Sequence, residues 1–348
     1  FSKRRWKIYR FTFSIIIFLF ANQIERYVFN LNGMASVLMG AAFSVLFFNL
    51  MAIFSAVLKG LGMSSKATLV ESVLYPFCAL VLVYPLISIC GMAGASIAYM
   101  AGTIFASLVG LIVWRSAISG RPPTSRVNRN ELSASSRPLW LSMTIIQAQP
   151  WIPILLLGIW ATPSDAGVLG VASRSALLIS LILSAINTVL APRLTVLFKQ
   201  DQIAQIENLA CKCALFATSL SAPFLITFIF FGDLVMSIFG IDFSSAGNIL
   251  AILALGQFVN AFTGPAGAIL MMGGREEDIR TLSLISVSVV ILLAMILIQS
   301  HGVKGAAIAT SAGFISMNLF SVFMVRLRFK IWIFPYFSNF REFNRKNV

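Results

Sequence analysis

The sequence predicts an all-α membrane protein built from two copies of one helical bundle. Hydrophobic residues make up 58% of the chain and charged residues only 11%, whereas soluble domains average about 45–50% apolar and about 25% charged residues. Apolar stretches of about 20 residues, the length that crosses a bilayer as a helix, recur along the chain. Finally, segment 91–108 returns at 302–319 with nine identities in eighteen positions. Strand alternation is absent, which disfavours a transmembrane barrel.

Ten spans are predicted, because a helix satisfies its backbone polar groups internally where water is absent. The first four are residues 8–24, 33–58, 67–89 and 91–114, and the other six are residues 139–160, 165–191, 209–231, 245–272, 279–299 and 303–325. Pro150 and Pro153 in the fifth span, and Gly264-Pro265-Ala-Gly267 in the eighth, mark bends, because proline removes a backbone hydrogen bond. Such bends are hinges, cavity walls or simple kinks.

Residues 119–138 form the one long polar connection and divide the chain. We expect an N-terminal bundle at 1–118, a cytoplasmic linker at 119–138, a C-terminal six-helix bundle at 139–326 and a basic cytoplasmic tail at 327–348. Gly62 aligns with Gly274 and Gly91 with Gly302, at offsets of 212 and 211. This register places residue 1 two spans into its bundle, so we predict ten visible helices of a twelve-helix parent, six in each half. The alternative is a natural ten-span protein.

The net charge of +14 follows the positive-inside pattern rather than indicating a nucleic-acid partner. If the basic N-terminus is cytoplasmic, alternate loops and the C-terminus hold 23 of the 26 Lys and Arg residues on the same side. We therefore expect a multi-pass protein of the bacterial inner membrane whose basic loops and C-terminus are cytoplasmic.

Little in the sequence supports catalysis or metal binding. Its four cysteines, Cys78, Cys90, Cys211 and Cys213, lie in apolar stretches without nearby ligands, and His301 is the one histidine. We predict that the cysteines are packing residues and that the protein has no catalytic residue, no metal site and no cofactor.

Small residues recur at helical spacing in both copies of the repeat. They are Gly91, Gly94, Ala98, Ala101 and Gly102 in the first copy, and Gly302, Gly305, Ala309, Ala312 and Gly313 in the second. Small side chains allow membrane helices to approach closely, so we predict packing surfaces.

Arg174 is the main candidate for substrate binding. It lies about nine residues into its span, roughly 13 Å from the outer end, and a guanidinium at depth costs on the order of 3 kcal/mol. No Asp or Glu lies deep in a visible span, which favours an anionic substrate over a structural ion pair. Neutral polar residues of other spans could line the same cavity or serve as interhelical hydrogen-bonding groups. They are Gln147, Gln149, Asn187, Gln257 and Asn260.

Several motifs resemble the polysaccharide-transporter branch of the multidrug, oligosaccharidyl-lipid and polysaccharide (MOP) exporter superfamily, which includes O-antigen flippases. They are Gly167-Val-Leu-Gly-Val-Ala-Ser-Arg174, Ala191-Pro-Arg193, Gly264-Pro-Ala-Gly267, Met272-Gly-Gly-Arg275 and Gly302-Val-Lys-Gly-Ala-Ala-Ile-Ala309. The resemblance implies a MATE-like fold whose two halves enclose a cationic cavity, with Arg174 at a position where a basic residue often faces that cavity. The fifth span departs from the family pattern, since Gln147–Pro153 lacks the acidic-basic pair that is common there.

The resemblance implies a flippase that moves a polyprenyl-pyrophosphate-linked oligosaccharide, such as an O-antigen, capsule or exopolysaccharide repeat unit, by alternating access. Expected partners are this substrate, membrane lipids and polymerases or ligases of a polysaccharide pathway. One alternative is a multidrug exporter of the same superfamily. Another is a membrane glycosyltransferase, which is disfavoured because the longest outer loop, 232–245, offers only Asp233 and Asp242 as candidate catalytic groups.

Overall fold

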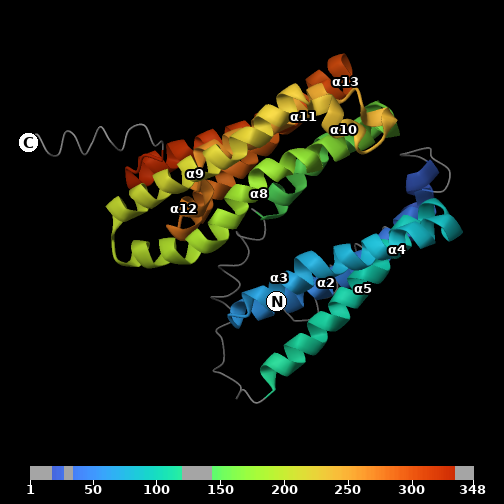
Figure 1. Ribbon diagram of the computed structural model, residues 1–348, viewed down its shortest axis with the longest axis horizontal. Coiled ribbons are helices and arrows are strands. Elements are labelled where there is room, and N and C mark those ends of the chain that lie inside the picture. The colour runs from blue at the N-terminus through green and yellow to red at the C-terminus, as the bar shows by residue number, and fades with distance from the viewer. Residues whose placement is uncertain (1–17, 27–33, 120–142, 334–348) are drawn as a thin grey trace, which may run out of the picture. The chain divides into compact units, whose positions relative to one another are not determined.

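A computed structural model describes residues 18–26, 34–119 and 143–333 of the protein. These residues are helical almost throughout and contain no β-strand, which confirms the predicted all-α class. The chain divides into two compact units, Phe1–Arg126 and Val127–Val348, and each is described by itself (Figure 1). Apart from Ser119, the predicted linker lies outside the described residues.

The described part of the N-terminal unit contains three long helices. Their bounds are Met34–Gly60 for α2; Ser64–Thr68, Leu69–Leu74 and Tyr75–Cys90 for the continuous helix of α3, the π-helical stretch η2 and α4; and Met92–Ile118 for α5. The last of these, α5, packs against both α2 and α4. The close approach of α5 to α4 depends on glycine, because an added Cβ at Gly102 of α5 would lie 2.5 Å from the carbonyl oxygen of Tyr75 in α4. Of the span predicted at 8–24, only residues 18–24 are described, and these are helical.

The C-terminal unit contains the other long helices. Their bounds are Gln149–Trp151 for the 3-10 turn η3, Ile152–Trp160 for α7, Pro163–Lys199 for α8, Ile203–Phe230 for α9, Gly232–Ser237 for α10, Ile241–Phe243 for the 3-10 turn η4, Gly247–Thr263 for α11, Ala266–Met272 for α12 and Glu276–Phe329 for α13. Helices α8, α9, α11 and α13 pack side by side (Figure 1). Two apolar clusters fill this bundle, one around Leu169 and Leu250 and the other around Leu194 and Leu270.

The two last predicted spans form a hairpin that is continuous as a helix except at one glycine. At 54 residues, α13 would extend about 81 Å if it were straight, more than twice the ~30 Å hydrocarbon core of a bilayer. Gly302 interrupts it with φ 54° and ψ −128°. The Ser286 hydroxyl, before this turn, donates to the carbonyl oxygen of Gly313, after it, at 2.7 Å. The two parts of α13 therefore lie side by side.

The same turn occurs in the first copy of the repeat, which gives structural support to the duplication. Gly91 has φ 58° and ψ −138° between α4 and α5. Three residues after each turn, an added Cβ at Gly94 or Gly305 would overlap a backbone carbonyl of the preceding helix, that of Leu86 or Leu297. The predicted packing role of these glycines is confirmed.

A second pair of aligned glycines also adopts one conformation. Gly62 and Gly274 have φ of 79° and 72° after α2 and α12. The amide that follows each glycine donates to the carbonyl five residues earlier, from Met63 to Leu58 at 2.9 Å and from Arg275 to Leu270 at 3.0 Å. This is the Schellman pattern that ends a helix at a glycine. The aligned residues therefore end corresponding helices in both halves.

The predicted bend at Gly264-Pro265 is confirmed, the prolines of the fifth span coincide only with a short 3-10 turn, and two helix ends differ from the prediction. One 3-10 turn covers Pro150, and α11 and α12 meet at 50° across Gly264-Pro265. The span predicted at 165–191 continues to Lys199, and the one predicted from residue 209 begins at Ile203. Both differences lie at the basic end of the bundle, where charged residues lower the hydropathy without interrupting the helix.

The segment that follows α13 packs back onto the bundle. The predicted tail boundary was residue 327, whereas α13 continues to Phe329 and Lys330 ends it in a left-handed conformation. Ile331 and Ile333 are buried in the cluster around Leu194 and Leu270. An added Cβ at Gly264 would lie 3.4 Å from Ile333, so this segment covers the break between α11 and α12.

Seven helices of the described residues could cross a membrane by length and composition, or eight if α11 and α12 form one bent span. That count takes α13 as one helix, although it contains two predicted spans. Every predicted span from 33–58 onward has a helical counterpart, whereas the predicted total of ten is not confirmed, because residues 8–17 lie outside the described part.

Substitution of Gly305 tests the hairpin packing. We expect Gly305→Ala to lower the free energy of unfolding by about 1–3 kcal/mol, because its Cβ must displace the Leu297 carbonyl. Gly267→Ala is the matched control, since no atom lies within 4 Å of its added Cβ on helix α12. Thermal unfolding in detergent would compare the two, and equal midpoints would contradict the proposed close contact.

Candidate functional site

Arg174 lies on α8, whose start is fixed by a capping box. The amide of Asp165 donates to Oγ1 of Thr162 at 3.2 Å, the Thr162 amide donates to the Asp165 carboxylate at 3.1 Å, and Pro163 occupies the first turn. Since Arg174 follows Pro163 by eleven residues, it lies about 16 Å along the helix. Its side chain is exposed in the C-terminal unit taken alone, and it forms no hydrogen bond or ion pair with another described residue.

An exposed apolar stripe continues from Arg174 along α8. Positions spaced by three or four residues share one face of a helix. From Arg174 onward these positions are Leu178, Leu181, Ala185, Val189, Pro192 and Val196, and all are exposed in this unit. The exposed fractions are 58% for Leu181 and 65% for Val189, so neither side chain belongs to the core of its own bundle.

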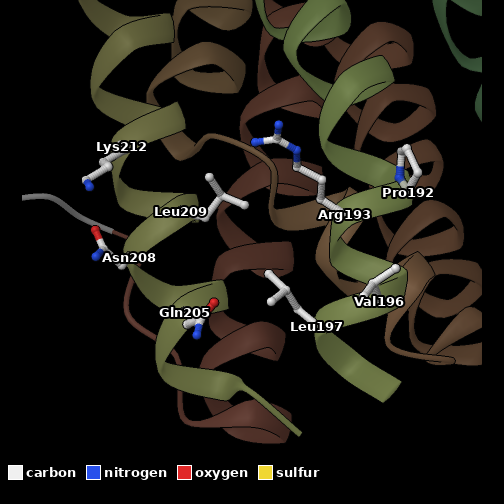
Figure 2. Close-up of a pocket in the computed structure, with 8 residues that line it drawn as sticks. All are labelled: Pro192, Arg193, Val196, Leu197, Gln205, Asn208, Leu209 and Lys212. Atoms are coloured by element: carbon white, nitrogen blue, oxygen red, sulfur yellow. The ribbon is translucent and has the colours of Figure 1, made fainter. Parts of the chain in front are cut away.

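The stripe ends at a groove between the basic ends of α8 and α9. The groove has a volume of about 680 Å³ and is lined from α8 by Pro192, Arg193, Val196 and Leu197, and from α9 by Gln205, Asn208, Leu209 and Lys212 (Figure 2). Figure 2 shows the Arg193 side chain extending from α8 toward α9, with Leu197 and Leu209 between the helices. Lys212 lies at the outer edge, with its ammonium group turned away from Arg193.

Arg193 and Lys212 are both among the basic residues assigned to the cytoplasmic side from the charge pattern. The structure places Arg193 on α8, which continues past the predicted span end at residue 191, and Lys212 near the start of α9. A short turn joins the two helices, so the two residues line one groove. The available signal was the helix-compatible sequence between Pro192 and Lys199, which contains no glycine.

The predicted neutral residues occupy different environments. Gln147 is exposed and Asn260 is partly buried. Gln149 and Gln257 are 6% and 4% exposed. Nε2 of Gln149 donates to Oγ of Ser286 at 2.9 Å, which joins residues 143–160 to α13.

Asn187 carries the one buried side-chain oxygen without a hydrogen-bond partner among the described residues, its Oδ1. It lies thirteen residues after Arg174 on α8, about 20 Å along the axis and about 140° around it. The two side chains therefore do not share a helix face.

No group of three or more potential metal ligands occurs among the described residues. Cys211 is buried, and its thiol donates to the carbonyl oxygen of Trp332 at 3.1 Å. This contact joins α9 to the segment after α13, which agrees with the packing role predicted for Cys211.

A family described as polysaccharide biosynthesis protein matches residues 8–244. Two relatives from Haloferax volcanii are 27% identical to the chain, “Probable low-salt glycan biosynthesis flippase Agl15” over 165 residues and “Probable flippase AglR” over 190 residues. These matches cover 47% and 54% of this chain but only 35% and 39% of the relatives.

Solved structures with the same fold include the lipid II flippase MurJ in an inward closed conformation. It has a TM-score of 0.75 at 17% identity, covering 93% of this chain and 71% of MurJ. An inward-facing MATE family transporter of the MOP superfamily has a TM-score of 0.72 at 16% identity, covering 92% and 77%. These similarities confirm the expected polytopic fold.

The contact between Gln149 and Ser286 is testable by a double-mutant cycle. We expect Gln149→Ala and Ser286→Ala to be coupled by about 0.6–1.7 kcal/mol, the usual range for hydrogen bonds between membrane helices. Thermal or denaturant unfolding of both single variants and the double variant gives the coupling energy. If the two single substitutions lower the free energy of unfolding additively, the hydrogen bond between Gln149 and Ser286 does not contribute to stability, and the prediction is wrong.

Proposed function

The chain belongs to the polysaccharide biosynthesis protein family, and on that premise we propose that it is a flippase for a lipid-linked oligosaccharide. The substrate we propose is a polyprenyl-pyrophosphate-linked repeat unit of an O-antigen, capsule or exopolysaccharide. The protein would move it across the bacterial inner membrane, with the basic end of the bundle facing the cytoplasm. Polymerases or ligases of the same pathway are the proposed partners.

The unpaired guanidinium of Arg174 carries this proposal. A charge at such depth costs on the order of 3 kcal/mol unless it meets water or an opposite charge, and no described carboxylate pairs with it. A pyrophosphate is a suitable partner, because arginine donates two parallel hydrogen bonds to phosphate oxygens. Gln147, Asn187, Gln257 and Asn260 remain proposed contacts for the sugars, and Gln149 could join them only by giving up its bond to Ser286.

In the proposed cycle, the pyrophosphate head enters a cavity open to the cytoplasm and pairs with Arg174, while the polyprenyl tail remains in lipid. Movement of the two halves against each other then opens the cavity outward. With the interior negative, outward transfer of about two negative charges gains roughly 4–5 kcal/mol per 100 mV, provided that the arginine charge does not travel.

A multidrug exporter is the alternative, and the MATE-like fold suits it equally well. Organic cations would favour carboxylates that are available at depth. Three of the described acidic side chains instead have local roles: Asp165 caps α8, Asp233 accepts from the amide of Gly247, and Asp278 pairs with Arg328. The related proteins named above are described as flippases and transporters rather than enzymes, so we assign no catalytic residue.

Substitution of Arg174 tests the anion role. We expect Arg174→Ala to reduce translocation of a pyrophosphate-linked oligosaccharide roughly tenfold to hundredfold, the effect of losing a charged hydrogen bond, and Arg174→Lys to retain part of the activity. Complementation of a flippase-null strain at equal protein level provides the measurement.

Lys304→Gln is the matched control, because it removes an exposed basic residue of the same unit. Full activity of Arg174→Ala would exclude the assigned role. Equal losses for Arg174→Ala and Lys304→Gln would show a general effect of charge.

The membrane potential provides an independent test. In proteoliposomes with an imposed potassium gradient and valinomycin, we expect faster outward transfer when the compartment corresponding to the cytoplasm is negative. Transfer measured by access of a glycan-specific lectin should slow when the gradient is collapsed. A rate independent of potential would rule out charge movement as the driving force.

A further inference from the structure

We propose that the groove between α8 and α9 binds the phosphate head group of an anionic membrane lipid, with Arg193 and Lys212 as its cationic contacts. The site is distinct from Arg174, and it requires no translocation activity. It would anchor the basic end of the C-terminal bundle to the adjacent lipid leaflet.

The electrostatics of the groove favour an anion. Arg193 and Lys212 line it together, and neither forms a hydrogen bond or ion pair with another described residue. Glu207 is the acidic residue on α9 nearest in sequence to the residues that line the groove. It is not part of the lining, and it already interacts with another group. The two cations lie on opposite sides of the groove, which gives it a positive potential that attracts an anion. A phosphate is a suitable anion, because it accepts hydrogen bonds from guanidinium and ammonium groups at once.

The remaining lining suits a lipid better than a free ion. Leu197 and Leu209 extend between the helices, and Val196 is 52% exposed at the α8 side (Figure 2). Gln205 and Asn208 add neutral hydrogen-bonding groups for a head-group alcohol. The volume of about 680 Å³ exceeds what one phosphate needs.

The position along α8 agrees with the level of lipid head groups. Arg193 follows Pro163 by thirty residues, which corresponds to about 45 Å of helix. A bilayer with its head groups is about 40–45 Å thick. A helix that begins at one surface therefore brings Arg193 to the opposite surface, where basic pockets between membrane helices bind anionic head groups.

Binding of short-chain lipids to the detergent-purified full chain tests this site. Dioctanoyl phosphatidylglycerol and dioctanoyl phosphatidylcholine are titrated by microscale thermophoresis. We expect phosphatidylglycerol to bind more tightly, and its affinity to fall about fivefold for each of Arg193→Gln and Lys212→Gln and about thirtyfold for the double variant. Leu209→Gln should weaken lipid binding while it keeps both charges.

Lys199→Gln is the matched control, because it removes an exposed charge from the same end of α8 outside the groove and should leave affinity unchanged. Equal affinity of the wild-type protein and the double variant would overturn the proposal, as would equal affinity for the two lipids. Competition by inorganic phosphate at the lipid's own concentration, or equally tight binding of an acidic peptide, would also contradict a lipid site. Because no transport is measured, failure here leaves the Arg174 proposal to its own test.

Discussion

Close backbone contact at glycine turns is the constraint on which this structure depends. Lipid tails are as apolar as the side chains, so transferring an apolar side chain from lipid to a helix interface gains little free energy. Membrane helices therefore associate through close packing and interhelical hydrogen bonds. At Gly91 and Gly302 the chain reverses in a conformation that side chains rarely adopt, and Gly94 and Gly305 then let one helix contact the backbone of the previous one. The hydrogen bond between Ser286 and Gly313 depends on that approach. Both copies of the repeated sequence therefore pair their two helices through the same glycine turn and the same close backbone contact.

Much of this arrangement could be predicted from the sequence, because its cause is local. The break at Gly264-Pro265 and the two hairpin turns follow from glycine and proline conformations, and the repeat identifies them twice. The ends of α8 and α9 were predicted wrongly, since hydropathy reports the part of a helix that lies in lipid, whereas backbone hydrogen bonding continues to Lys199. The groove beside Arg193 was missed for that reason.

Side-chain partners were harder to predict than helices. Gln149 and Asn187 both appeared as polar groups of a cavity, yet one bonds to Ser286 and the other has an unpaired oxygen. Hydrogen bonds between distant segments depend on helix rotation and register, which one sequence does not specify. Arg174 could be singled out because an arginine deep in an apolar span needs water or an opposite charge, and this need can be inferred before the packing of the helices is known. Arg174 and Arg193 thus lie on a single helix, both without a described partner, separated by about 28 Å of mostly apolar surface.

The short segment after α13 bears on how the bundle moves. Ile333 packs at Gly264, where α11 and α12 meet at an angle, and Trp332 accepts a hydrogen bond from α9. These contacts hold the segment after α13 against the break between α11 and α12. A change in the angle between α11 and α12 must therefore either break the contact of Ile333 with Gly264 or move Ile333 with the helices. The position of residues 331–333 therefore reflects the angle between the two parts of this broken helix.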